Sequence, residues 1–166
     1  MIKNNRGFTL IELLLYTVIA AGLLLSITAM ISLLIQSRIK NQTISIVEQE
    51  GTQILQIITQ EIRNSTTVVN PSSGTIGDNL QIQNSSGQNT AFSIADNTLV
   101  QTKNGQTTGM LSNQVLISDL KFINLTPDST HNSIKITFTL SYNNIAGRNE
   151  YSYSQTFYDT ATLRQP

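Results

Sequence analysis

Glu12 is the side chain whose chemistry stands out in this sequence, because it is a carboxylate inside a long apolar run. Residues 8–35 contain no other charged side chain. A lone carboxylate in hydrocarbon costs at least ~2.5 kcal/mol, so it persists where a cation or a function compensates that cost. Two interpretations follow: Glu12 either pairs with a cation inside the membrane or lies near the headgroups, where it is solvated.

Few residues in this chain are suited to catalysis or metal binding. The sequence has no cysteine, which excludes disulfides, thiolate metal sites and cysteine nucleophiles. Its single histidine, His131, lies in a turn-like stretch, and a catalytic histidine needs oriented partners. Asp78 and Asp96 are each followed by asparagine, a pattern that indicates turns rather than calcium ligands. We expect no enzymatic activity, no cofactor and no metal site.

Charge and composition narrow the class of protein further. Lysine plus arginine (10) equals aspartate plus glutamate (10), so the basic excess typical of a nucleic-acid binder is missing and no direct nucleic-acid site is evident. Charged residues make up 12% of the chain, compared with roughly 25% in average soluble domains. Beyond the apolar run, Ser, Thr, Asn and Gln dominate. This composition favours a water-exposed domain outside the cytoplasm.

The apolar run is long enough for a membrane helix, since about 20 apolar residues cross a bilayer. Lys3 and Arg6 precede it, which places the N-terminus in the cytoplasm and the bulk of the chain across the membrane. Three interpretations compete for this end. It is a secretory signal cut near Ala21, an uncleaved signal anchor, or a short leader cut after Gly7 that leaves the apolar helix on the mature protein.

The third interpretation depends on a motif. The stretch Gly7-Phe8-Thr9-Leu10-Ile11-Glu12-Leu13-Leu14 follows a basic leader and resembles the cleavage and methylation motif of type IV prepilins and pseudopilins. The resemblance implies cleavage between Gly7 and Phe8 by a prepilin peptidase, followed by N-methylation of Phe8. It also implies that Glu12 pairs with the Phe8 amine of a neighbouring pilin or pseudopilin subunit as the helices assemble. Further partners implied are the inner-membrane assembly platform and membrane lipid.

The apolar helix is expected to continue into an amphipathic half. We divide the chain into a leader (1–7), a transmembrane and assembly helix (8–35), an amphipathic continuation (36–64) and an extracytoplasmic β-rich domain (65–166). The amphipathic face comprises Val47, Ile54, Ile58 and Ile62, with Leu55 widening it. Gly51 interrupts this face and would permit a bend. We expect the face to pack on the protein's own sheet.

Short alternating segments separated by Gly, Asn and Asp predict strands after residue 64. They span 80–83, 90–95, 99–102, 115–125, 133–142 and 151–158. A tight turn is expected at Asp96-Asn97 and a longer hairpin loop at Asn143–Gly147. The four tyrosines Tyr142, Tyr151, Tyr153 and Tyr158 are expected to alternate on the last hairpin. The fold class predicted is α+β, with the second half of a long N-terminal helix packed on an antiparallel sheet.

This layout resembles the larger minor pilins and pseudopilins of the PilW/PulJ type. The expected function is that of a structural subunit in a type IV pilus, or in a secretion or competence pseudopilus. It would be a single-pass membrane protein before assembly and part of the filament afterwards. The alternative is a membrane-anchored extracytoplasmic binding module that belongs to no filament.

Overall fold

A computed structural model describes residues 9–126 and 133–163 of the chain. These residues belong to two compact units, 1–40 and 41–166, which we describe separately. Helix α1 (Leu10–Asn64) contributes to both. No proline occurs before Pro71, so no residue in the helix lacks a backbone donor. The helix ends at Asn64, where the Ser65 amide and hydroxyl both donate to the Ile62 carbonyl, at 3.1 and 2.7 Å.

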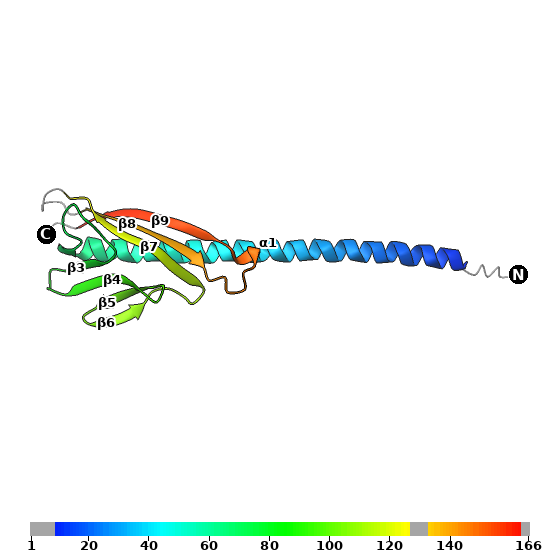
Figure 1. The fold of residues 1–166 in the computed structure, drawn as a ribbon, viewed down its shortest axis with the longest axis horizontal. Coiled ribbons are helices and arrows are strands. Elements are labelled where there is room, and N and C mark those ends of the chain that lie inside the picture. The colour runs from blue at the N-terminus through cyan, green and yellow to red at the C-terminus, as the bar shows by residue number, and fades with distance from the viewer. Residues whose placement is uncertain (1–8, 127–132, 164–166) are drawn as a thin grey trace, which may run out of the picture. The chain divides into compact units, whose positions relative to one another are not determined.

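In the unit 41–166, α1 packs its amphipathic face against sheet residues, as the spacing of apolar residues predicts. Val47, Ile54, Ile58 and Ile62 are all buried, and Leu55 is partly buried against the same core. The predicted α+β class, with a helix on antiparallel strands, is confirmed (Figure 1). The core is completed from the strands by large side chains that include Phe92, Phe122 and Phe138.

Gly51 lies on the buried face of α1, beside the ring of Phe157. The helix continues through it from Leu10 to Asn64. A Cβ atom at position 51 would lie 2.1 Å from Cζ of Phe157, well inside van der Waals contact. The glycine therefore makes room for an aromatic ring from the last strand.

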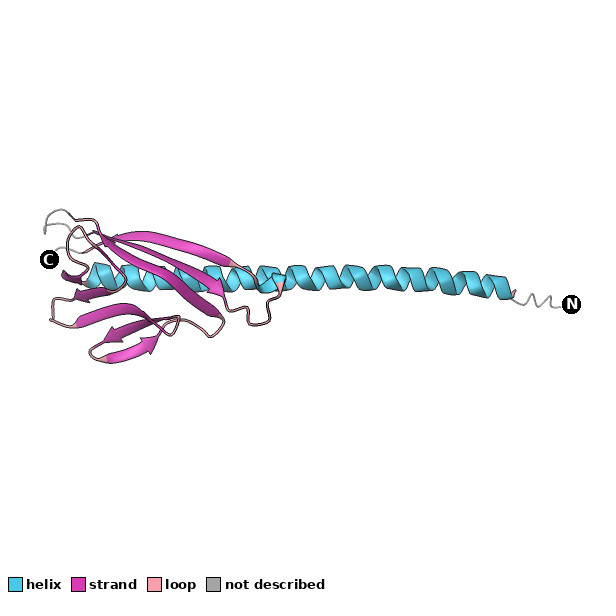
Figure 2. Cartoon of the chain, in the orientation of Figure 1, coloured by secondary structure: helices cyan, strands magenta, loops and turns pink. Residues whose placement is uncertain are grey.

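The predicted antiparallel strands are arranged in two sheets. The first has the order β1-β3-β4-β5-β6 and the second β2-β7-β8-β9. The first sheet comprises β1 (Thr67–Asn70), β3 (Leu80–Gln83), β4 (Asn89–Ala95), β5 (Thr98–Lys103) and β6 (Gln106–Gly109). The second comprises β2 (Ile76–Gly77), β7 (Val115–Asn124), β8 (Ser133–Tyr142) and β9 (Ser154–Thr162). Apart from α1 and a short 3-10 turn, the described chain consists of strands and loops (Figure 2).

The chain changes sheet in the segment 110–114, which contacts α1. Met110 and Leu111 pack against the core, and the Ser112 amide donates to the Glu50 carboxylate at 3.2 Å. The Ser112 hydroxyl donates to the other oxygen of the same carboxylate. These contacts tie the connection to the helix at the point where the chain passes from the first sheet to the second.

The predicted turn at Asp96-Asn97 is confirmed. Both residues have positive φ, 50° and 58°, and they join Ala95 and Thr98, which pair across the β4–β5 hairpin. Two successive residues of positive φ are typical of a type I′ turn, whose twist matches that of the flanking strands. The Asn97 carbonyl also accepts a hydrogen bond from the Ile117 amide at 3.0 Å, which links the two sheets.

The prediction for the last strand was wrong in its boundaries. We expected residues 151–158, but Asn149–Tyr151 form a 3-10 turn and β9 begins only at Ser154. Tyr151 therefore lies outside the hairpin strands, and the four tyrosines do not alternate on them as predicted. The loop between β8 and β9 is longer than Asn143–Gly147 because it includes this turn.

Candidate functional site

Glu12 lies in the first turn of α1, within the unit 1–40. The Thr9 carbonyl accepts hydrogen bonds from the Glu12 and Leu13 amides, at 3.1 and 3.2 Å, and so starts the helix. A carboxylate in the first turn is favoured because the helix dipole places partial positive charge there. Gly7 and Phe8, the predicted cleavage and methylation sites, lie outside the described residues. Their relation to Glu12 stays a prediction.

Glu12 is intermediate in exposure, whereas its neighbours are exposed. Leu10 is 84% exposed and Ile11 77% exposed. Two ion pairs occur among the described residues, Lys103–Glu61 and Arg148–Glu150, and neither involves Glu12. Within the part of the chain that the structure describes, this carboxylate thus has no cationic partner.

The apolar segment that follows Glu12 presents its side chains outward on every side. None of the residues from Leu10 to Ile35 is buried. Helix α1 contains a stretch long and apolar enough to cross a membrane by length and composition. A helix that is apolar all round is stable where lipid or other helices cover it.

The hydroxyl groups in this segment bond to the helix itself. Thr17 donates to the Leu14 carbonyl at 2.8 Å, and Thr28 donates to the Leu24 carbonyl at 2.8 Å. Ser26 and Ser32 donate in the same way to carbonyls four residues earlier, each at 3.0 Å. Such bonds let serine and threonine enter hydrocarbon without leaving a polar group unsatisfied.

The loop between β8 and β9, predicted over Asn143–Gly147, is a second feature, with an unusual surface that the sequence did not indicate. It carries Ile145, which is 90% exposed. At its base the rings of Tyr142 and Tyr151 stack with centroids 5.5 Å apart. The Arg148 guanidinium lies 5.6 Å from the centroid of the Tyr151 ring. The only signal in the sequence was the turn-forming composition of Asn143–Gly147.

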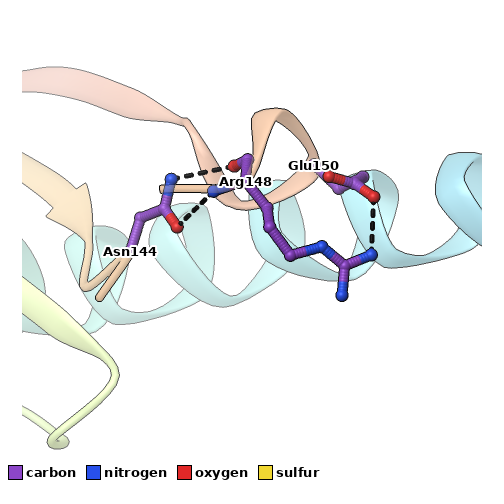
Figure 3. A network of polar contacts seen from close by, with 3 residues as sticks. All are labelled: Asn144, Arg148 and Glu150. Carbon is purple, nitrogen blue, oxygen red and sulfur yellow. Dashed lines mark hydrogen bonds and ion pairs between the residues drawn. The ribbon is translucent and has the colours of Figure 1, made fainter. Parts of the chain in front are cut away.

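Charges in this loop are paired with each other. Arg148 Nη2 lies 2.7 Å from Glu150 Oε1 (Figure 3). The hydrogen bond from Arg148 holds the pKa of the Glu150 carboxyl below its usual value, and the same bond raises the pKa of Arg148. Near the start of β9, burial and the Glu48 carboxylate raise the pKa of the Tyr153 phenol. The Tyr153 hydroxyl donates to Gln155 at 2.8 Å and to Glu48 at 3.4 Å.

The unit 41–166 also has a shallow groove of about 620 Å³ between α1 and the segment 110–114. Most of the residues that line it are polar, and Glu50 in its wall is already bonded to Ser112. No group of three or more His, Asp or Glu side chains that could hold a metal ion occurs within residues 9–126 and 133–163. His131 and Asp128 lie outside those ranges.

Comparison of the chain with protein-family models, with curated proteins and with solved structures found no match.

Proposed function

We propose that this chain is a structural minor pilin or pseudopilin subunit. It is cleaved after Gly7, methylated on Phe8 and assembled through its N-terminal helix into a type IV pilus, or into a type II secretion or competence pseudopilus. The single observation that supports this most is the position of Glu12. It lies in the first turn of a helix whose apolar side chains are uncovered, with no cation paired to it among the described residues.

Assembly would both cover the apolar side chains of the helix and provide a cation for Glu12. Neighbouring helices would cover the apolar side chains between Leu10 and Ile35. A terminal amine created on Phe8 would supply the charge that Glu12 lacks, and a pair in a low-dielectric bundle is much stronger than one in water. A buried polar pair of this kind also fixes the register between subunits, as a buried polar group does in coiled coils. The partners are then the prepilin peptidase, other subunits, the inner-membrane assembly platform and lipid.

The first test is the mature N-terminus. Mass spectrometry of the membrane-extracted protein should show a chain that begins at Phe8 and carries one methyl group. The Gly7→Val variant should accumulate as an uncut precursor. A chain beginning at Met1 or after Ala21 would instead favour a membrane-anchored binding module or a secreted protein.

The second test separates cleavage from assembly. Glu12→Gln keeps the size of the side chain and removes its charge, so the variant should insert and be cleaved but fail to co-purify with other subunits. Glu61→Gln is the matched control, because Glu61 lies on the same helix and pairs with Lys103 on the sheet. Normal recruitment of Glu12→Gln would refute the proposed role of the carboxylate.

A further inference from the structure

The side chain of Ile145 is the most exposed large apolar group among the described residues of the unit 41–166. Its 90% exposure exceeds that of Tyr158, at 73%, and of Ile76, at 64%. An isoleucine left in water forgoes the free energy that burial of its apolar surface would release. A surface contact that covers it is therefore favourable.

The loop holds Ile145 in a defined position. The Asn144 side chain spans the turn, since its Nδ2 donates to the Arg148 carbonyl at 2.8 Å and its Oδ1 accepts from the Arg148 amide at 3.1 Å (Figure 3). The Gly147 amide donates to the Asn144 carbonyl at 3.3 Å, and Gly147 has a φ of 64°, which glycine adopts without strain. A contact made by an ordered loop loses little conformational entropy.

The residues around the base of this loop are of the kind found at membrane interfaces. Tyr142 and Tyr151 stack there, and Arg148 lies over the Tyr151 ring. Tyrosines concentrate at the level of lipid headgroups. The Arg148 charge is balanced by Glu150 at 2.7 Å, so this pair brings no net charge into the headgroup layer.

Contacts that Tyr153 and the following strand β9 make with α1 show which end of the unit carries the loop. Tyr153 contacts Glu48, Phe157 fills the space beside Gly51, and Asp159 accepts a hydrogen bond from Thr59 at 3.2 Å. In these contacts the residue numbers increase in the same direction along β9 and along α1. The residues before β9 therefore lie toward the low-numbered end of this part of the helix. The three residues from Tyr142 to Ile145 span up to ~10 Å when extended. Helix α1 covers the same distance between Glu48 and Asn41, so the loop is long enough to reach the level of Asn41.

At Asn41 the unit continues along the chain into the segment that holds the apolar helix. We propose that the loop between β8 and β9 inserts into the lipid headgroup layer before assembly, with Ile145 as its apolar contact. This inference rests on the membrane anchoring in the proposed function. The loop would restrain the C-terminal unit at the bilayer surface until a subunit is taken into a filament.

The absence of cysteine makes a clean test possible, because single cysteines can be labelled in the full chain. Three variants are needed, each carrying a bimane fluorophore: Ile145→Cys, Leu24→Cys in the apolar segment, and Ser86→Cys. Ser86 is exposed in the turn between β3 and β4, and its neighbour Asn84 lines a hollow with Glu61, near the far end of α1. The proteins are reconstituted into phosphatidylcholine–phosphatidylglycerol vesicles that contain lipids with nitroxide quenchers in the headgroup or in the acyl chain.

We expect headgroup nitroxides to quench the Ile145→Cys label at least twofold more than the Ser86→Cys label. Acyl-chain nitroxides should quench the Leu24→Cys label in the same vesicles. If Leu24→Cys is quenched while Ile145→Cys matches Ser86→Cys, the loop does not meet lipid and the inference is wrong. If Leu24→Cys is not quenched, membrane anchoring itself fails, and the proposed function fails with it.

Discussion

Gly51→Ala offers a sharp test of how α1 packs, because two effects of known size oppose each other. Alanine favours a helix interior over glycine by about 1 kcal/mol, so on propensity alone the substitution stabilises the protein. The structure predicts the opposite result. The new Cβ would lie 2.1 Å from Cζ of Phe157 and 2.4 Å from both Cε atoms, whereas carbon atoms pack at about 3.5–4 Å.

The Phe157 ring is partly buried and packs on the core through one of its faces. It stacks on Phe138 with centroids 5.5 Å apart, and Phe138 is fully buried. Overpacking of this kind costs up to about 3 kcal/mol, so we expect a net loss of about 2 kcal/mol after the helix-propensity gain. For a unit of this size that loss lowers Tm by roughly 6–10 °C.

The assay is thermal unfolding of the full chain in detergent, monitored by near-ultraviolet circular dichroism. This signal reports on the packed tyrosines and phenylalanines of the C-terminal unit. Gly22→Ala is the matched control: the same change in the same helix, at a site where no atom lies within 4 Å of the added Cβ. It should leave the Tm of this transition unchanged. A Gly51→Ala Tm equal to or above that of the wild type would refute the packing argument.

Three further outcomes are expected. Glu50→Gln should lower the free energy of unfolding by about 1 kcal/mol, because the Glu50 carboxylate accepts two hydrogen bonds from Ser112. In a double-mutant cycle, Glu50→Gln should have little further effect when Ser112→Ala is already present. Asn97→Val should cost about 1–3 kcal/mol because a β-branched residue is strained at a φ of 58°, while Asn97→Gly should keep full stability in the same urea titration. The raised pKa of Tyr153 means that the folded state favours the neutral phenol. The stability that this neutral phenol contributes is complete below the ordinary tyrosine pKa of about 10, and it is lost as the pH rises through the pKa of Tyr153 in the folded state. Tyr153→Phe should flatten that alkaline decline in Tm, and an unchanged decline would show that another group causes it.

The helix and most strands were predictable because their signals are local and periodic. Val47, Ile54, Ile58 and Ile62 recur at helical spacing, and all four are buried. Strict alternation between Ile134 and Leu140 likewise predicted β8, whose apolar residues face the core. Asp96-Asn97 was predictable because these residue types tolerate the positive φ that the turn requires.

What the sequence did not reveal depends on contacts between distant residues. Nothing near Gly51 in the chain indicates Phe157, so its role as a space for that ring was not predictable. Strands β1, β2 and β6 were not predicted. Strand β2 has only two residues, and all four residues of β6 are exposed, so neither shows the apolar alternation that marks β3. In the loop between β8 and β9, order comes from the Asn144 side chain bonding to Arg148, which leaves no pattern of hydrophobicity.

The position of Glu12 in the candidate site was predictable from the sequence, but its partner was not. A carboxylate in an apolar run is visible in composition, and the structure places Glu12 in the first turn of α1. Its partner is not predictable from the fold of one chain, because the proposed pair joins two chains. Whether the Phe8 amine fills that role stays a prediction until the mature N-terminus and the Glu12→Gln variant are measured.

The inward hydroxyl bonds of the apolar helix bear on the proposed transfer of this segment from lipid into a filament. Because Thr17, Ser26, Thr28 and Ser32 already satisfy themselves on their own backbone, exchanging lipid tails for protein neighbours breaks none of these bonds. Under the proposed function, the segment would therefore change surroundings with these four hydroxyl bonds intact. A helix of that kind is suited to a subunit that is stored in one environment and delivered to another.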